Sequence, residues 1–399
     1  MVSAWAASPT PTRWTCSSPS TSSCSNVPRT SPPPWCSPAR PPSTASSPAH
    51  PPRADPATRV HDTPISSYAE AGVDLDLAQR AKAGLSSAVA STATPLTLDA
   101  FGAFGGVIRL PADIPDPAIV ASIDGVGTKL HLAIEMGRPA DAGRDLVNHC
   151  LNDVAVQNAR PIAFLDYVAA DRLDPEVLTS LVQGMAAACR DAGVSIVGGE
   201  TALMPDTYAP GRYDAVGAVI GVASAANLPD PANVSVGDVC IGLPSSGPHT
   251  NGYSLARELL TIYDRDTTIG DQSLEDALLA PHLSYLSEFA TAFAVPGTRV
   301  AAHITGGGIA ENLERVLPES VTALIDTTVW PQPPIFEAIA DGLDVSPAEM
   351  FRVFNMGVGA ILVASPDTAT HLLEELPHAL RVGTIADRHQ SPVELTPTP

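Results

Sequence analysis

The sequence predicts an α/β protein with two domains of similar size, and three observations support this prediction. Short apolar runs typical of buried strands alternate with longer stretches whose apolar residues recur every three to four positions. One segment rich in Pro, Asn and Asp, at 227–234, divides this alternation into two halves. The length of 399 residues is enough for two ordinary domains.

The elements of the first half follow from these patterns. Residues 118–123 form a short apolar run that ends at Asp124-Gly125, as expected of a buried strand followed by a turn. Residues 141–159 place their apolar side chains at helical spacing, which predicts an amphipathic helix packed on a core. The other expected elements are a helix over about 75–90, strands over 162–169, 194–197 and 215–222, and a helix over 175–192.

The second half repeats the alternation after the boundary at 227–234. It is expected to contain strands over 239–243 and 321–325 and helices over 252–262, 282–294 and 309–316. Because both halves mix strands with helices, neither resembles an all-α or all-β domain.

The first sixty residues have a different composition from the rest. Residues 1–60 hold 14 of the 40 prolines and only one acidic residue, and they show no apolar periodicity. Such a Pro- and Ser-rich segment cannot bury enough apolar surface to offset its chain entropy, so we expect it to be disordered. Our hypothesis is that translation starts near Val60; a transit peptide is the weaker alternative.

Charge and hydropathy exclude two classes of partner. The formal net charge of −21 leaves no basic surface for a nucleic-acid backbone. No stretch approaches the roughly 20 apolar residues that a membrane span needs.

The widely spaced Cys150, Cys189 and Cys240 lie in apolar surroundings, which indicates reduced thiols in a cytoplasmic protein.

Three short strings place acidic side chains where they could hold a metal ion. Asp124-Gly125-Val126-Gly127-Thr128-Lys129 combines a carboxylate, two glycines, a hydroxyl and an ammonium after a strand, which suits Mg²⁺-nucleotide binding, although a plain charged turn explains it equally well. Asn152-Asp153 lies in an apolar helix, where Asp153 either binds a cation or faces solvent. Gly198-Gly199-Glu200-Thr201 follows a strand and adds a third acid.

Three glycine-rich strings could approach phosphates. Phe101-Gly102-Ala103-Phe104-Gly105-Gly106 is either such a loop or a connector. The string Ser245-Ser246-Gly247-Pro248-His249-Thr250-Asn251-Gly252 precedes an expected helix, and helix capping explains only part of it. Thr305-Gly306-Gly307-Gly308 precedes another expected helix.

In this order and spacing, these strings resemble phosphoribosylformylglycinamidine cyclo-ligases (AIR synthetases). Tyr68-Ala69-Glu70-Ala71-Gly72-Val73-Asp74 and Phe164-Leu165-Asp166-Tyr167 add to the resemblance, which extends from about Ser66 to the C-terminus. Each string is weak alone, but their joint order is specific. The sequence lacks the Rossmann, metalloprotease and Gly-x-Ser-x-Gly signatures of commoner enzymes.

The resemblance implies a fold, a reaction and a partner. It implies an AIR-synthetase-like α+β fold with an N-terminal β-rich, half-barrel dimerising domain over 66–230 and a C-terminal α/β domain over 235–399. The implied enzyme is a homodimer of purine biosynthesis that uses ATP and Mg²⁺ to close formylglycinamidine ribonucleotide into aminoimidazole ribonucleotide, releasing ADP and phosphate. An inactive nucleotide-binding paralogue, or another ATP-dependent member of the same superfamily, is the alternative.

The resemblance also assigns roles to individual residues. His249, Lys129 and Asp124 are the catalytic candidates, and Asp124, Asp153 and Glu200 are the metal ligands. The ATP contacts are assigned to Lys82, Gly102, Phe104, Gly105, Gly106, Thr128 and Lys129. The substrate phosphate is assigned to Ser245, Ser246, Gly247, Thr250, Asn251, Thr305, Gly306 and Gly307. The family loop usually reads Gly-Gly-Phe-Gly, so Ala103 is a departure that puts the ATP contacts of the loop in question.

Overall fold

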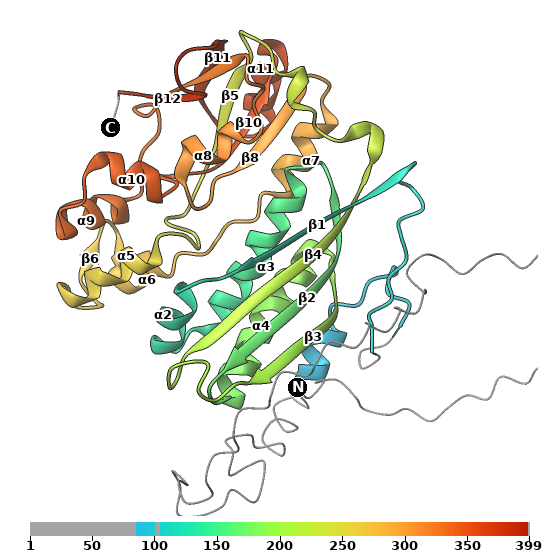
Figure 1. The fold of residues 1–399 in the computed structure, drawn as a ribbon, viewed down its shortest axis with the longest axis vertical. Coiled ribbons are helices and arrows are strands. Elements are labelled where there is room, and N and C mark those ends of the chain that lie inside the picture. The colour runs from blue at the N-terminus through green and yellow to red at the C-terminus, as the bar shows by residue number, and fades with distance from the viewer. Residues whose placement is uncertain (1–84, 100–103, 398–399) are drawn as a thin grey trace, which may run out of the picture. The chain divides into compact units, whose positions relative to one another are not determined.

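The computed structural model describes residues 85–99 and 104–397, and these residues belong to one compact unit (Figure 1). The predictions for the first sixty residues, for Lys82 and for Gly102 and Ala103 lie outside the described residues. Within the described part, residues 85–90 are helical, as expected for the end of the first predicted helix.

The N-terminal half is built on an open four-stranded sheet. Its strand order is β1-β4-β2-β3, and only the β2–β3 pair is parallel. The strands are β1 (Pro117–Gly125), β2 (Arg160–Ala170), β3 (Ser195–Leu203) and β4 (Tyr213–Ser224). The four predicted strands are confirmed, and the described residues contain no closed barrel.

Two long helices cover one face of this sheet (Figure 1). They are α3 (Pro139–Ala155) and α4 (Pro175–Ala192), which confirm the two predicted helices. Asp174 caps α4 by accepting a hydrogen bond from the backbone N–H of Glu176. Glycine permits the close approach of the two helices, because a Cβ at Gly184 would lie 1.9 Å from the carbonyl oxygen of Ala140.

The C-terminal half is built on a six-stranded sheet of order β12-β9-β11-β5-β10-β8. All its pairs are antiparallel except β12–β9. Its strands are β5 (Val239–Pro244), β8 (Thr298–His303), β9 (Val321–Asp326), β10 (Val358–Ala364), β11 (Leu380–Asp387) and β12 (Val393–Thr396). The segment 227–234 before this sheet follows the 3-10 helix Ala225–Asn227 and contains a second one, Pro231–Asn233.

The helices of this half are shorter than those of the first. They are α5 (Tyr253–Ala256), α6 (Leu274–Leu278), α7 (Leu286–Ala294), α8 (Gly308–Glu314), α9 (Pro334–Leu343), α10 (Pro347–Val353) and α11 (Pro366–Glu375). The mixed sheets and covering helices of both halves confirm the predicted fold class. Among the described residues, no helix is long and apolar enough to cross a membrane.

Three local predictions are corrected. The expected helix over 252–262 is one α-turn, α5, followed by the 3-10 helix Arg257–Thr261. The helix expected from 282 begins at Leu286. The string 198–201 does not follow its strand but lies inside β3, because the backbone of this string continues to pair with β2.

Candidate active site

The candidate site begins where β1 packs against α3. Successive side chains of a strand point to opposite faces, so Ser122 and Asp124 share the face that meets the helix. His149 and Asp153 are four residues apart on α3 and therefore share one helix face. His149 Nε2 lies 2.7 Å from Asp124 Oδ2, and Ser122 donates a hydrogen bond of 3.0 Å to Asp153 Oδ2.

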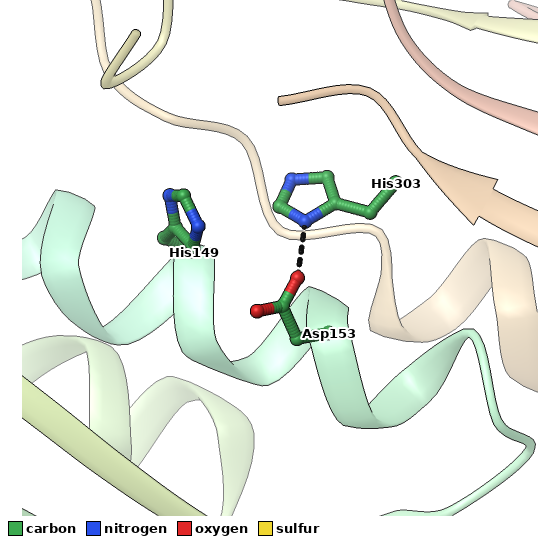
Figure 2. Close-up of side chains that lie close together, drawn as sticks. All are labelled: His149, Asp153 and His303. Carbon is green, nitrogen blue, oxygen red and sulfur yellow. Dashed lines mark hydrogen bonds and ion pairs between the residues drawn. The ribbon is translucent and has the colours of Figure 1, made fainter. Parts of the chain in front are cut away.

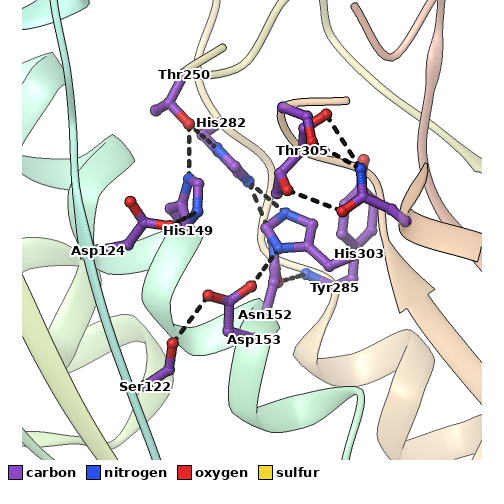
Figure 3. A network of polar contacts seen from close by, with 12 residues as sticks. Ser122, Asp124, His149, Asn152, Asp153, Thr250, His282, Tyr285, His303 and Thr305 are labelled. Atoms are coloured by element: carbon purple, nitrogen blue, oxygen red, sulfur yellow. Dashed lines mark hydrogen bonds and ion pairs between the residues drawn. The ribbon is translucent and has the colours of Figure 1, made fainter. Parts of the chain in front are cut away.

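The C-terminal half supplies the other side of the site (Figure 3). His303, the last residue of β8, lies with its Nδ1 2.8 Å from Asp153 Oδ1. The hydroxyl of Thr250 is 2.7 Å from His149 Nδ1 and 3.3 Å from His282 Nδ1. His282 Nε2 is in turn 3.0 Å from His303 Nε2. A continuous polar chain therefore connects the two carboxylates through both halves of the protein.

The electrostatics of the site keep both carboxylates ionised. Burial acts to raise the pKa of Asp124, but the hydrogen bond and charge of His149 outweigh burial and hold it below its usual value. The pKa of Asp153 is lowered in the same way, since His303, His149 and Ser122 together outweigh the effect of burial. Ionised carboxylates are ligands that Mg²⁺ prefers, although here each one is already hydrogen-bonded to a histidine.

His249 is fully buried next to the polar residues that connect the two carboxylates. It is stacked on His282 with ring centroids 4.2 Å apart, and its backbone has a positive φ of 58°. Among the described residues, neither of its ring nitrogens has a hydrogen-bond partner. Burial lowers the pKa of His249 well below its usual value, so the ring is neutral at neutral pH.

Lys129, expected at the ATP phosphates, occupies a different environment. Its side chain is 0% exposed and forms an ion pair of 2.6 Å with Asp145 on α3. The same ammonium donates to the carbonyl oxygens of His249 (2.8 Å) and Ala280 (2.6 Å). Since an ammonium has three N–H donors, none remains for a phosphate in this arrangement. Thr128 lies at the N-terminus of α2 (Lys129–Glu135) and makes no side-chain cap there.

Glu200 is not brought to the other two carboxylates within one chain. The register aligns Asp124 with Gly217, Gly217 with Asp166, and Asp166 with Gly199, the neighbour of Glu200. Three strand spacings of about 4.8 Å therefore separate β1 from β3, or about 14 Å. The three acids cannot bind one ion together in this chain.

The glycine loop lies beside β3 rather than β1. Gly106 packs so closely on Val197 that a Cβ at this position would lie 2.3 Å from the Val197 carbonyl oxygen. Gly105 has open space around it, and the Phe104 side chain is fully exposed. The described part of the loop is therefore accessible at the opposite edge of the sheet from Asp124.

The two strings assigned to the substrate phosphate lie next to each other. A Cβ at Gly306 would lie 3.4 Å from Asn251 Oδ1, which places the second string beside the first. Asn312 holds the second string by donating to the carbonyl oxygens of Thr305, Gly306 and Gly308. Gly307 has φ of 92°, a conformation that favours glycine.

The first string is tied into the C-terminal half by side chains. Ser245 donates to Asn355 Oδ1 at 2.9 Å, and Asn355 donates to the Gly247 carbonyl oxygen at 2.9 Å. Ser246 donates to the carbonyl oxygen of Pro281. Both serine hydroxyls thus have protein acceptors, so ligand contact by this string falls to its backbone and to its other side chains, such as that of Asn251.

Sequence reasoning missed three members of the site, namely His149, His282 and His303. A signal existed for two of them. His149 lies four residues before Asp153 in a predicted helix, and His303 lies two residues before Thr305. For His282 the sequence offers no such spacing, because its contacts come only from the tertiary fold.

Asp166, part of the Phe164–Tyr167 string, is a buried carboxyl on β2. Desolvation by burial raises its pKa from 3.8 to about 7. Because the folded chain binds this proton more tightly than the unfolded chain, the stability present below about pH 4 is lost as the pH rises to about 7.

We therefore expect Asp166→Asn to flatten the pH dependence of stability. Between pH 5 and pH 8, the wild type should lose about 2–3 kcal/mol more unfolding free energy than the variant, because one pKa unit corresponds to about 1.4 kcal/mol. Urea unfolding at both pH values measures this difference. Equal losses in the two proteins would show that Asp166 is ionised in the folded state.

Solved structures of low sequence identity share the fold. Thiamine-monophosphate kinase from Stenotrophomonas maltophilia K279a is 17% identical, with a TM-score of 0.58 and coverage of 82% of this chain and 97% of that chain. The hydrogenase maturation protein HypE from E. coli is 18% identical, with a TM-score of 0.58 and coverage of 79% and 92%. At this identity the likeness concerns the fold alone.

Curated relatives are much closer in sequence. A protein of Nitrosococcus oceani named phosphoribosylformylglycinamidine cyclo-ligase is 42% identical over 313 residues, which is 78% of this chain and 87% of the relative. A protein of the same name from Bifidobacterium animalis subsp. lactis is 38% identical over 340 residues, covering 82% and 99%. Two family models also match, the N-terminal domain of AIR synthase related protein over 104–223 and its C-terminal domain over 235–395. With both domains matched in order and close relatives covering most of its length, the chain belongs to the AIR synthase related family.

Proposed function

We propose that this protein catalyses the ATP-dependent closure of formylglycinamidine ribonucleotide to aminoimidazole ribonucleotide, with release of ADP and phosphate, in purine biosynthesis. The observation that carries the proposal is the pair of ionised carboxylates, Asp124 and Asp153, held between two halves of a chain whose close relatives are named cyclo-ligases. The reaction needs both a nucleotide site and a substrate site, and the two-domain arrangement provides a surface for each.

The chemistry explains the need for ATP. An amide oxygen is a poor leaving group, and transfer of a phosphoryl group to the formyl amide oxygen makes it a good one. An internal nitrogen of the same molecule then closes the ring. Because the enzyme holds both ends of this one molecule close together, the entropic part of the activation barrier is lowered. Mg²⁺, when bound, neutralises the charge of the transferring phosphoryl group.

The residues of this chain divide the work as follows. Asp124 and Asp153 hold Mg²⁺, and the backbone of 104–106, with Lys82 and Gly102, contacts ATP. The backbone of the adjacent strings 245–252 and 305–308 receives the substrate phosphate. His249 remains the catalytic candidate beside the substrate; its neutral ring is buried in this structure with both nitrogens unpartnered, so contact with the substrate requires a local rearrangement. Lys129 positions this string by binding the His249 carbonyl oxygen, instead of contacting ATP itself.

The proposed enzyme is a homodimer in the cytoplasm. Three free, buried cysteines are compatible with a reducing compartment. The dimer proposal rests on the sheet face opposite α3 and α4. On that face, Ile119 and Ile123 of the edge strand β1 are 65% and 70% exposed. Leu96, Ile108 and Ile114 pack against Ile162 and Val222 of this sheet, and a second copy would remove the exposed isoleucines of β1 from water.

This dimer predicts the effect of one substitution. Ile123→Glu should raise the dimer dissociation constant about 100-fold or more, because it buries an unpaired charge and each 1.4 kcal/mol is a factor of ten. Sedimentation velocity over a concentration series measures the shift, with Leu228→Glu, an exposed leucine outside the sheet, as the matched control. A monomeric wild type, or a variant as dimeric as the wild type, would disprove the proposed interface.

The test of the proposed activity is substrate-dependent ADP release by the full chain with ATP, Mg²⁺ and formylglycinamidine ribonucleotide. Formation of aminoimidazole ribonucleotide in equal amount to ADP is the expected result. Folded protein that binds Mg²⁺-ATP but releases no ADP would instead identify an inactive paralogue.

A further inference from the structure

Three side chains that donate well to metals converge between the two halves of the protein. His149 and Asp153 come from α3, and His303 comes from the end of β8 (Figure 2). One ring nitrogen of each histidine and one carboxylate oxygen of Asp153 all lie within 4.8 Å of one another. His149 and His303 are buried, so these donors are largely removed from competition with water.

Both imidazoles are oriented by a second hydrogen-bond partner. His149 Nδ1 lies 2.7 Å from the Thr250 hydroxyl, which leaves Nε2 on the side of the carboxylates. His303 Nε2 lies 3.0 Å from His282, which leaves Nδ1 facing Asp153. Histidines that bind metals almost always use their other ring nitrogen in such a bond, because it fixes the tautomer and the ring orientation.

The three donors lie within 4.8 Å of one another, so a transition-metal site needs only side-chain adjustments of up to about 1.5 Å. Two ligands of a tetrahedral Zn²⁺ ion lie about 3.3 Å apart, because each bond is about 2.0–2.1 Å long. His303 Nδ1 and Asp153 Oδ1, now 2.8 Å apart, need to separate by only a few tenths of an ångström. A second carboxylate, that of Asp124, lies 2.7 Å from His149 Nε2 and adds negative charge beside the three donors. Binding of a metal by Nε2 releases the proton that this nitrogen shares with Asp124.

The identity of the donors selects the class of ion. Two imidazole nitrogens suit Zn²⁺, Co²⁺ and similar ions, whereas Mg²⁺ prefers oxygen ligands alone. Cys150 follows His149 in sequence, but its thiol points to the Gly217 carbonyl oxygen at 3.5 Å, so sulfur takes no part in this donor set.

We propose that His149, Asp153 and His303 form a binding site for one divalent transition-metal ion of the Zn²⁺ class. Such an ion occupies Asp153 and so competes with Mg²⁺. This competition, unlike the binding itself, rests on the magnesium role proposed for Asp153 above. The site therefore makes the enzyme sensitive to inhibition by zinc.

Cobalt is a direct probe of the site, because its visible spectrum reports the number and type of its ligands. We expect the full wild-type chain, without ATP or substrate, to bind one equivalent of Co²⁺. The visible absorption of this bound Co²⁺ should differ from that seen when Co²⁺ is added to the same protein after saturation with Zn²⁺. His303→Asn should weaken this binding at least about tenfold, since loss of even an outer-shell partner of a metal ligand costs about 10–100-fold. His389→Asn is the matched control. His389 is exposed, and its side chain forms a hydrogen bond with the surface residue Glu394, away from the candidate site.

Several outcomes would overturn the proposal. Equal Co²⁺ affinity in the wild type and His303→Asn, or a strong sulfur-to-cobalt charge-transfer band that accounts for all bound metal, places the ion elsewhere. If His303→Asn does not fold, His149→Gln applies the same test. Inhibition by Zn²⁺ that is independent of the Mg²⁺ concentration would disprove the proposal that the two ions compete for Asp153. The cyclo-ligase activity is measured separately, at saturating Mg²⁺ and without zinc, so failure of either proposal is distinguishable from failure of the other.

Discussion

Asp124→Asn is expected to lower the rate of ADP formation at least about 100-fold while leaving the fold intact. The substitution keeps the size of the side chain but removes the charge that holds Mg²⁺, and loss of several kcal/mol of transition-state stabilisation corresponds to this factor. Steady-state ADP release at saturating Mg²⁺ measures the effect. Thermal unfolding of the same preparation shows whether the protein is folded.

The matched control for this variant is Asp367→Asn, which removes an exposed carboxylate from the first turn of α11. It should retain wild-type activity, because it changes the net charge equally but lies outside the candidate site. Wild-type activity in Asp124→Asn would remove Asp124 from the metal ligands. Partial recovery at high Mg²⁺ would support a weakened metal site, since binding then follows mass action.

Lys129→Met is expected to have the largest effect on stability, with a loss of about 3–5 kcal/mol of unfolding free energy. It removes one partner of a fully buried ion pair and leaves the Asp145 carboxylate uncompensated. It also removes the donor shared by the carbonyl oxygens of His249 and Ala280. Urea unfolding monitored by circular dichroism measures the loss.

A second substitution separates the charge effect from other causes. Lys129→Met combined with Asp145→Asn should recover a large part of the lost stability, because the double variant no longer buries an unpaired charge. In the wild type, Asp145 Oδ1 accepts a hydrogen bond of 2.7 Å from the backbone N–H of His282. An asparagine at position 145 keeps an oxygen that can accept the same bond. If the double variant is as unstable as the single one, the uncompensated charge is not the cause.

Periodicity predicted most of the main strands and helices. The strand at 118–123 and the helix at 175–192 were both confirmed, because their apolar faces are properties of the local sequence. The predictions failed where tertiary contacts override local preference. The string 198–201 has two glycines that suggest a turn, yet pairing with β2 keeps it extended.

The candidate site was predicted only in part. The family resemblance named Asp124 and Asp153, and the structure places each of them beside a histidine of the site. The roles of Lys129 and Glu200 did not follow from the sequence. Lys129 reaches the carbonyl oxygen of Ala280, 151 residues away, and Glu200 is separated from Asp124 by two intervening strands.

By itself, the sequence determined the fold class, the order of the main elements and the resemblance to a family, because each depends on local periodicity or on short ordered strings. Only the tertiary structure decided which polar residues form the site. A carboxylate or an ammonium becomes a ligand or a buried ion pair according to the partners that surround it. For Lys129, His282 and His303, these partners are brought together from segments that are far apart in the chain.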